Sequence, residues 1–344
     1  MKTKYQHLCL TVAMVVSFIV PTRAADQNQQ TAPPTLKIIH FNVGNGDATF
    51  VVVERGSTKR TLLIDGGNWE MAGKVVIPGI QQEIPSGWID YAIATHYDAE
   101  HRDGLVRVVR SLGMSGLGVV YDRDRTWPYT AKSSTDEEKV QERPLQPGSR
   151  IPLDPLSPSS ADSRVVIECV AANGNTKGWR WTTQDPPLDE NAESLAFLIT
   201  FGKFRYFIGG DLTGGGRSGW NATPNIESAV SSDVGQVSVL RVNHHGSRTS
   251  TNQVFLSGLN PNVAIISTGH DRNDDQNYPW PSREVLDRLD ALPHLGAVYI
   301  TGEVNTPKGL TPDDKKKVRS NQGNISITTT GQGTFKVNET SYSL

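Results

Sequence analysis

Residues 95–104 have the sequence THYDAEHRDG. Between His96 and His101 this stretch places two imidazoles and two carboxylates, directly after the apolar segment 89–95. The end of a strand exposes side chains on a fixed backbone, so catalytic and binding residues are common there. Imidazole and carboxylate together are suitable ligands for zinc, manganese or iron. The stretch therefore predicts a metal site, with an ordinary charged loop as the alternative.

Two later segments end in residues of the same kind. Residues 206–211 have the sequence YFIGGD, an apolar strand followed by two glycines and Asp211. Residues 241–247 have the sequence RVNHHGS, which places His244 and His245 after another strand. Neighbouring side chains of an extended segment point in opposite directions. We therefore expect one imidazole to bind metal and the other to face substrate or to support a ligand.

In this order and spacing, the three segments resemble the metallo-β-lactamase superfamily. Its pattern is a His-x-His-x-Asp-His loop, then an Asp after a strand and a final His after another. The branch that the chain resembles contains the hydrolase domain of ComEC-type DNA-uptake proteins and the secreted phosphorylcholine esterases. Further segments similar to this branch are 40–48, 63–67, 243–247 and 324–337. The resemblance implies an α/β fold, the four-layer αββα metallo-β-lactamase sandwich.

The resemblance also implies one or two divalent ions, zinc or manganese, as cofactors. The implied ligands are His96, Asp98 and Asp211 for one ion, and Glu100, His101, Asp211 and His244 for the other. Asp211 would bridge the two ions, and His245 is an equal candidate for the ligand role of His244. Asp211, His245 and Asp65 are the implied catalytic residues. Asp65 would orient a ligand, and His245 or Asn243 would stabilise developing charge.

Three departures from the family pattern bear on the site. Asp98 stands where the pattern has its second His, and an oxygen ligand shifts the preference toward manganese. Glu100 replaces the usual Asp and is one methylene longer, so the second ion would be displaced or bound more weakly. The family also has a His ligand between the first loop and the later Asp, here called the middle His. Residues 189–194, DENAES, contain no His at this place, and Glu190 or Asn191 is the candidate substitute. Trp280 occupies a position where many relatives carry a His.

The implied reaction is hydrolysis of a phosphodiester, in a small molecule or in nucleic acid, by a metal-bound hydroxide. A second hypothesis is a degenerate metal site that serves a secreted binding protein, and it rests on Glu100 and on the missing His. A third is a β-lactamase or thioester hydrolase on the same fold. The HHGS sequence at 244–247 and the missing His disfavour it. Metal content separates the second hypothesis from the other two, and a substrate panel separates the two enzymes.

The remaining composition indicates an exported globular protein. The 344 residues carry a formal net charge of -2, so no overall basic field attracts nucleic acid. Residues 1–24 have a basic start, an apolar stretch and small residues before Ala25, and are predicted to be a signal peptide. This predicts a secreted or periplasmic protein without stable membrane association after cleavage. We expect a linker at 25–35, the hydrolase domain at 36–338 and a tail at 339–344.

Strands are expected to dominate, with a hairpin turn at 55–58 and helices at 105–112 and 282–292. Residues 122–163 are rich in charge, proline and serine, and we expect a surface excursion with a little helix. Cys169 lies in an apolar segment and is expected to be a buried structural thiol.

Overall fold

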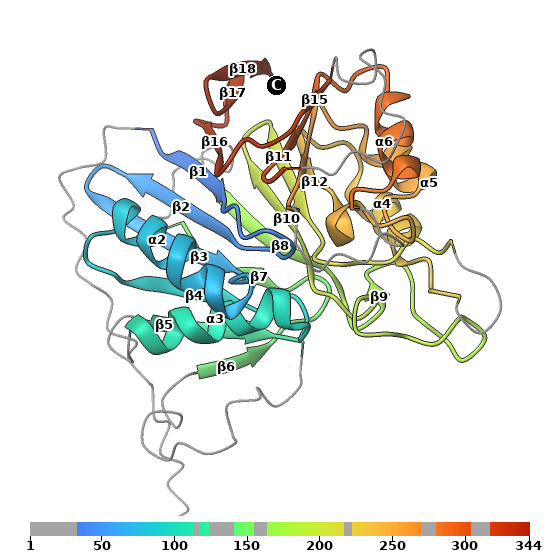
Figure 1. Cartoon of the computed structure of the whole chain (residues 1–344), viewed down its shortest axis with the longest axis horizontal. Helices are drawn as coiled ribbons and strands as arrows, with labels where there is room; N and C mark the ends of the chain where they lie inside the picture. Colours follow the sequence, from blue (N-terminus) through green and yellow to red (C-terminus); the bar gives the residue numbers. More distant parts are fainter. Residues whose placement is uncertain are drawn as a thin grey trace, which may run out of the picture.

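The computed structural model describes residues 33–112, 117–123, 141–154, 164–216, 222–269, 280–303 and 317–344. The predicted signal peptide and most of the predicted linker lie outside these residues. Within them, the strands form two sheets of nine (Figure 1). None of the described helices combines the length and the hydropathy that a membrane crossing requires.

The first sheet has the order β18-β17-β16-β1-β2-β3-β4-β5-β6. Its strands are β1 (Thr35–His40), β2 (Thr49–Arg55), β3 (Thr58–Ile64), β4 (Ile89–Ile93), β5 (Leu117–Asp122), β6 (Gln141–Pro144), β16 (Ile325–Thr329), β17 (Thr334–Val337) and β18 (Thr340–Ser343). The predicted hairpin is confirmed, because β2 and β3 pair antiparallel around Gly56 and Ser57. Gly56 has a φ of 60°, which a tight hairpin turn requires.

The second sheet has the order β15-β14-β13-β12-β11-β10-β8-β7, and β9 pairs with β8 beside this path. Its strands are β7 (Arg150–Ile151), β8 (Val165–Ala172), β9 (Asn175–Thr176), β10 (Ala196–Phe201), β11 (Phe204–Ile208), β12 (Val239–Arg241), β13 (Val263–Ile266), β14 (Ala297–Ile300) and β15 (Val318–Arg319). The strands from β11 to β15 run parallel, so their carboxyl ends share one edge.

Alternating apolar residues give each sheet two buried faces. In β2, Val51 and Val53 join a central core shared with the second sheet, whereas Phe50 and Val52 join an outer core under helices. The outer core of the first sheet is covered by α1 (Trp69–Met71), η1 (Ala72–Val76), α2 (Ile77–Glu83) and α3 (Ala99–Leu112). The predicted four-layer αββα sandwich is therefore confirmed.

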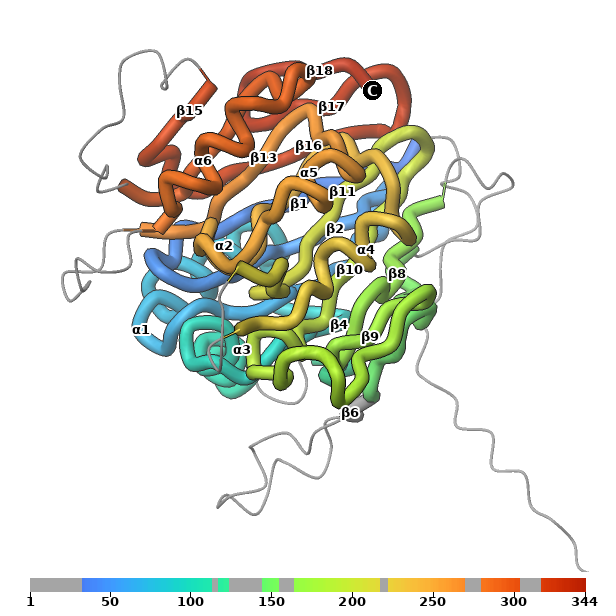
Figure 2. The backbone as a smooth tube through the Cα atoms, turned by 90° about the vertical axis from the view of Figure 1, so that its right-hand side faces the viewer, coloured from blue at the N-terminus to red at the C-terminus, as the bar shows by residue number. Residues whose placement is uncertain are grey.

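The second sheet is covered on its outer face by α4 (Ile226–Val234), α5 (Gln253–Leu259) and α6 (Arg283–Asp290). These helices lie on the side turned toward the viewer in Figure 2. Each begins at a side-chain cap, since Asn225, Asn252 and Ser282 accept hydrogen bonds from the backbone three residues on. Such caps satisfy amide groups that a helix start otherwise leaves unpaired.

Several sequence-based boundaries differ from the structure. Helix α3 begins at Ala99 rather than 105, so Glu100 and His101 lie in its first turn and not in a loop. Within the predicted excursion at 122–163, the described residues hold β6 and β7 and no helix, and these strands join different sheets. The predicted tail at 339–344 contains β18, because Thr340–Ser343 pairs with β17. Cys169 is buried, as expected.

Candidate metal centre

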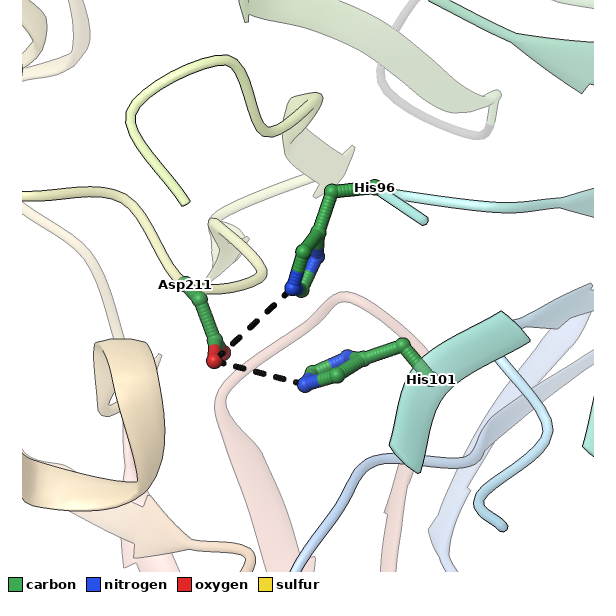
Figure 3. Close-up of side chains that lie close together, drawn as sticks. All are labelled: His96, His101 and Asp211. Carbon is green, nitrogen blue, oxygen red and sulfur yellow. Dashed lines mark ion pairs between the residues drawn. The ribbon is translucent and has the colours of Figure 1, made fainter. Parts of the chain in front are cut away.

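Five side chains meet where strands of both sheets end. His96 follows β4 and His101 lies in the first turn of α3, so both come from the first half of the chain. Asp211 follows β11, and His244 and His245 lie in the tight turn η7 (Asn243–Gly246), which follows β12. Figure 3 shows the imidazoles of His96 and His101 pointing at the Asp211 carboxylate. The second half of the sandwich thus completes a cluster that the first half begins.

Three of these side chains form a nearly equilateral triangle of ligand atoms. His101 Nε2 lies 3.2 Å from His245 Nε2, and each nitrogen lies 3.4 Å from Asp211 Oδ2. Two nitrogens bound at ~2.0–2.1 Å to one tetrahedral ion lie about 3.3 Å apart. The triangle therefore has the dimensions of one face of such a coordination shell. A carboxylate oxygen of Glu100 also lies within 4.8 Å of the ligand nitrogens of His101 and His245.

A wider group surrounds the same oxygen on the other side. His96 Nε2 lies 3.9 Å from Asp211 Oδ2 and 3.6 Å from Asp98 Oδ2, and His244 Nε2 lies 3.8 Å from Asp211 Oδ2. The buried Nε2 of His96 has no hydrogen-bond partner among the described residues. An unpaired polar atom of this kind is costly unless a ligand satisfies it. Both groups thus fit the donor set of a divalent metal site.

The other ring nitrogen of each buried histidine is held by a neighbour. His101 Nδ1 donates to Asp65 Oδ2 at 2.9 Å, and His245 Nδ1 donates to the carbonyl oxygen of Ser267 at 2.8 Å. Thr95 Oγ1 donates to Asp65, so it accepts from His96 Nδ1 at 3.0 Å. These bonds on Nδ1 orient each ring so that Nε2 points toward the cluster as the atom that a metal can bind.

The backbone around Asp65 ties the start of α3 to the end of β3. Asp65 itself has a left-handed backbone, with a φ of 57°. The amide of Gly66 donates to the carbonyl of His101 at 2.8 Å, and the amide of Gly104 donates to the carbonyl of Gly67 at 2.8 Å. Helix α3 can approach this closely because Gly66 and Gly104 have no side chains; a Cβ on Gly104 would lie 1.9 Å from the Gly66 oxygen.

The charges of the cluster suit a metal site. Burial raises the pKa of Asp211, but neighbouring imidazoles, chiefly that of His101, outweigh it and hold that pKa well below its ordinary value. Burial lowers the pKa of His244 to about 4. Asp211 is therefore an anion and His244 a neutral imidazole near pH 7. Both are the protonation states in which these side chains bind metal.

Sequence reasoning missed a buried ion pair beneath the cluster. The guanidinium of Arg241 is fully buried, forms an ion pair with the buried Asp47, and donates to the carbonyl of Gly210 at 2.5 Å. Arg241 Nη1 also lies 3.8 Å from Asp211 Oδ1, the oxygen that faces away from the imidazoles. No sequence pattern marked Arg241, because a single cation before an apolar residue is common.

Of the two candidate substitutes for the missing His, Glu190 already has other partners. Glu190 accepts from the backbone amide of Tyr97 at 2.7 Å and forms an ion pair with the buried Arg123. Asn191 Oδ1 is buried without a hydrogen-bond partner among the described residues.

Asn243, expected as a possible charge stabiliser, donates instead to Glu227 at 2.7 Å. The ring of Trp280 lies 6.0 Å from that of His244 and 5.7 Å from that of His245.

The sandwich, with polar side chains gathered at its strand ends, has the architecture of the metallo-β-lactamase fold. No family model matches the chain. Curated relatives include recombination protein 2 of Haemophilus influenzae, 25% identical over 76% of this chain and 27% of its own length. ComE operon protein 3 of Bacillus subtilis is 26% identical over 82% of this chain and 33% of its own length. The chain is similar in sequence to these ComEC-type proteins over most of its length, and its two sheets and their helices form a metallo-β-lactamase-type sandwich.

The chain spans about a third or less of the length of these relatives. Solved structures with a similar fold have lower sequence identity to this chain than these relatives do. The metallo-β-lactamase fold protein YhfI from Bacillus subtilis aligns with a TM-score of 0.46 and 11% identity over 87% of this chain and all of its own. A diphosphatase from the PhnP family aligns with a TM-score of 0.40 and 12% identity over 90% of this chain and all of its own. Both TM-scores lie below 0.5. The description of the fold therefore rests on the observed sandwich, and the similarity to ComEC-type proteins rests on the sequence relatives.

Proposed function

We propose that this chain is an exported, metal-dependent hydrolase that acts on phosphodiester bonds. The observation that carries the metal-dependent part is the triangle of His101 Nε2, His245 Nε2 and Asp211 Oδ2, with edges of 3.2 to 3.4 Å. The N-terminal sequence at 1–24 supports export. One or two divalent ions, zinc or manganese, are the proposed cofactors.

His96, His101 and Asp211 have ligand atoms within 4.8 Å of one another, but the distances to Asp211 Oδ2, 3.4 Å from His101 and His245 against 3.8 to 3.9 Å from His244 and His96, favour two groups that share Asp211. His101, His245 and Glu100 form the tighter group, and His96, Asp98 and His244 form the wider one. The adjacent imidazoles of His244 and His245 thus serve different ions, and His244 stands in for the missing middle His. This division assigns His245 to the ion for which the sequence pattern named His244.

The chain's own groups orient the site and control its protons. Asp65 holds the proton of His101 on Nδ1, and the Ser267 carbonyl does the same for His245. Arg241 lies beside Asp211 Oδ1, so the other carboxylate oxygen is directed at the imidazoles. A divalent ion, when bound, lowers the pKa of water enough to supply a nucleophile near pH 7 and polarises the bond to be cleaved.

The phosphodiester substrate is inferred from the names of the relatives and from the family resemblance. Two relatives are named recombination protein 2 and competence protein ComA, and recombination is a reaction of nucleic acid. The resemblance to the branch with phosphorylcholine esterases adds small phosphodiesters. Nucleic acid and small phosphodiesters share the diester group, so a substrate series that differs only beyond this group separates them.

A secreted binding protein is the second candidate, and one contact favours it. Glu190, a candidate for the missing ligand, is committed to Arg123 and to the Tyr97 amide, so it does not add to the wider group. A site with fewer donors would bind an ion less tightly. Metal content and turnover distinguish this candidate from the hydrolase.

The test uses residues 25–344, loaded with zinc or manganese, and bis(p-nitrophenyl) phosphate as substrate. Bound metal is measured by mass spectrometry, and turnover by absorbance. His101→Ala and His245→Ala are compared with His294→Ala, which changes an exposed histidine outside the cluster. We expect both cluster variants to lose the tighter ion and their turnover, while His294→Ala keeps both.

Each result has a defined meaning. Metal-dependent turnover that His101→Ala abolishes supports the hydrolase. Stable metal binding without turnover of diesters, lactams or thioesters supports a binding protein. If the wild-type protein retains neither zinc nor manganese, the metal site itself is wrong. Loss of the ion in His244→Ala but not in His245→Ala contradicts the division of the two histidines.

A further inference from the structure

The two histidines of η7 have an unusual backbone. His244 has φ 48° and ψ 48°, and His245 has φ 51° and ψ 19°, both in the left-handed region. Gly246 continues this conformation with a φ of 79°. Two consecutive residues with side chains rarely adopt it, because Cβ then crowds the following carbonyl oxygen. The surrounding structure must hold such a segment in place, and the strain commonly marks a functional site.

One buried carboxylate binds both ends of the loop that contains these histidines. Glu227 lies in the first turn of α4 and is fully buried. Its Oε1 accepts from Asn243 Nδ2 at 2.7 Å, just before His244, and from the amide of Thr251 at 2.6 Å. Its Oε2 accepts from the amide of Asn252 at 2.9 Å. Hydrogen bonds to a buried carboxylate are among the strongest that proteins make.

Further bonds inside the loop close it upon itself. Ser250 Oγ donates to the carbonyl of Asn243 at 2.9 Å, and the amide of Ser247 donates to the carbonyl of His244 at 2.7 Å. Thr251 is itself left-handed, with a φ of 54°. Glu227 thus holds the loop at Asn243 and at Thr251. The backbone is strained at the two histidines between these residues and also at Thr251 itself. A rigid link between the two ends fixes the directions of the side chains in between.

We propose that Glu227 is the positioning residue that keeps His244 and His245 in their left-handed conformation and directs their imidazoles at Asp211. The inference rests on the proposed metal-dependent function, which gives the two imidazoles a ligand role. Glu227 does not bind the ion itself, because its oxygens face Asn243, Thr251 and Asn252. It also packs against Gly214, where a Cβ would lie 2.1 Å from Oε2.

The experiment compares Glu227→Gln with Glu284→Gln. Both change a glutamate in the first turn of a helix, but Glu284 on α6 is exposed. In Glu227→Gln, the new side-chain NH2 group would face the backbone N–H of Asn252. The hydrogen bond between residues 227 and 252, called a tether below, is then lost, while the volume of the side chain is kept. Zinc affinity is measured by calorimetry, and the imidazole nitrogens of the metal-free protein are observed by long-range ¹H–¹⁵N NMR.

We expect Glu227→Gln to bind zinc about 10- to 100-fold more weakly, as for other residues that orient metal ligands. The NMR signals of His244 and His245 should shift in the metal-free protein, while that of His294, outside the cluster, stays. Glu284→Gln should match the wild type in both. Unchanged affinity with unchanged imidazole signals would overturn the proposal and leave Glu227 a structural residue.

Two further measurements separate the possible failures. If Glu227→Gln does not fold, Asn243→Leu removes one tether from the other side and should shift the same two imidazoles. In the wild-type protein, the amides of Thr251 and Asn252 should exchange slowly with solvent, and fast exchange would contradict the tether without any variant. If the wild type binds no zinc, the proposed function fails, but the imidazole signals still test the positioning.

Discussion

Asp65 combines a strained backbone with three hydrogen bonds at the centre of the site. Its Oδ2 accepts from His101 Nδ1 at 2.9 Å and from Thr95 Oγ1 at 2.7 Å, and its Oδ1 accepts from the Thr95 amide at 2.8 Å. Through Thr95 it also fixes the ring of His96. One carboxylate therefore orients a histidine from each of the two ligand groups.

The change Asp65→Asn tests this role with little effect on the backbone, since asparagine tolerates a left-handed φ. We expect metal affinity to fall about 10- to 100-fold, because the proton of His101 loses its charged acceptor. Calorimetric titration with zinc measures the change. Asp90→Asn is the control: Asp90 is also buried and accepts from Thr61, but it lies at the start of β4, away from the cluster. Equal loss in both variants would refute the specific role of Asp65.

Sequence reasoning found the residues that a short motif holds together and missed those that only the fold brings near. His96, His101 and Asp211 were predicted because each follows an apolar segment in a recognisable pattern. Arg241 and Glu227 were not, since their contacts with Asp47 and Asn243 join distant parts of the chain. The different directions of His244 and His245 depend on a left-handed backbone that no sequence pattern indicated.

Helix α3 is the element on which the first half of the site depends. It carries Glu100 and His101 in its first turn, and it lies against β3 through the contact of Gly104 with Gly66. The sequence predicted this helix from residue 105, because the apolar spacing begins there. Its first turn is polar, so the hydrogen bonds to 66 and 67 rather than hydrophobic periodicity define its start.

Gly104→Ala should displace α3 and with it His101. The added Cβ would lie 1.9 Å from the Gly66 oxygen, a backbone atom that cannot rotate away. We expect a loss of about 3 kcal/mol in the free energy of unfolding, at the upper end of overpacking effects, together with loss of metal. Urea unfolding and metal analysis measure both. Gly235→Ala, where φ is 70° and no atom lies within 4 Å, should cost about 1 kcal/mol and keep the metal. Retained metal in Gly104→Ala would contradict this expectation.

The two sheets are joined by polar contacts as well as by the central core. His40 on β1 contacts Thr49 Oγ1 through Nδ1 and the Tyr206 hydroxyl on β11 through Nε2, each at 3.2 Å. Burial, with a contribution from Arg241, lowers the pKa of His40 to about 3. The sandwich was predicted from the family resemblance that the motifs at strand ends carry. The crossover by β6 and β7, and the helices α4 and α5, lacked a clear periodic signal and were not.

This buried histidine makes stability depend on pH. The unfolded chain takes up a proton near pH 6.5 and the folded chain only near pH 3, so stability falls as pH decreases through this window. The shift in the pKa of His40 corresponds to a change of about 4–5 kcal/mol in the free energy of unfolding, at ~1.4 kcal/mol per pKa unit. His40→Gln should flatten the decline of the metal-free protein between pH 6.5 and 4, measured by urea unfolding. The exposed His294→Gln should keep the wild-type slope, and a wild-type slope in His40→Gln would exclude His40 as the cause.

Cys169 lies on β8 in the central core, and burial raises the pKa of its thiol to about 12. In the folded protein the sulfur is thus both inaccessible and protonated, so reagents that attack thiolates have no target there. Reaction requires the second sheet to open and expose the strand. The lone thiol among the described residues is therefore an internal probe of opening. The rate at which it is chemically labelled reports how often the two sheets of the sandwich separate.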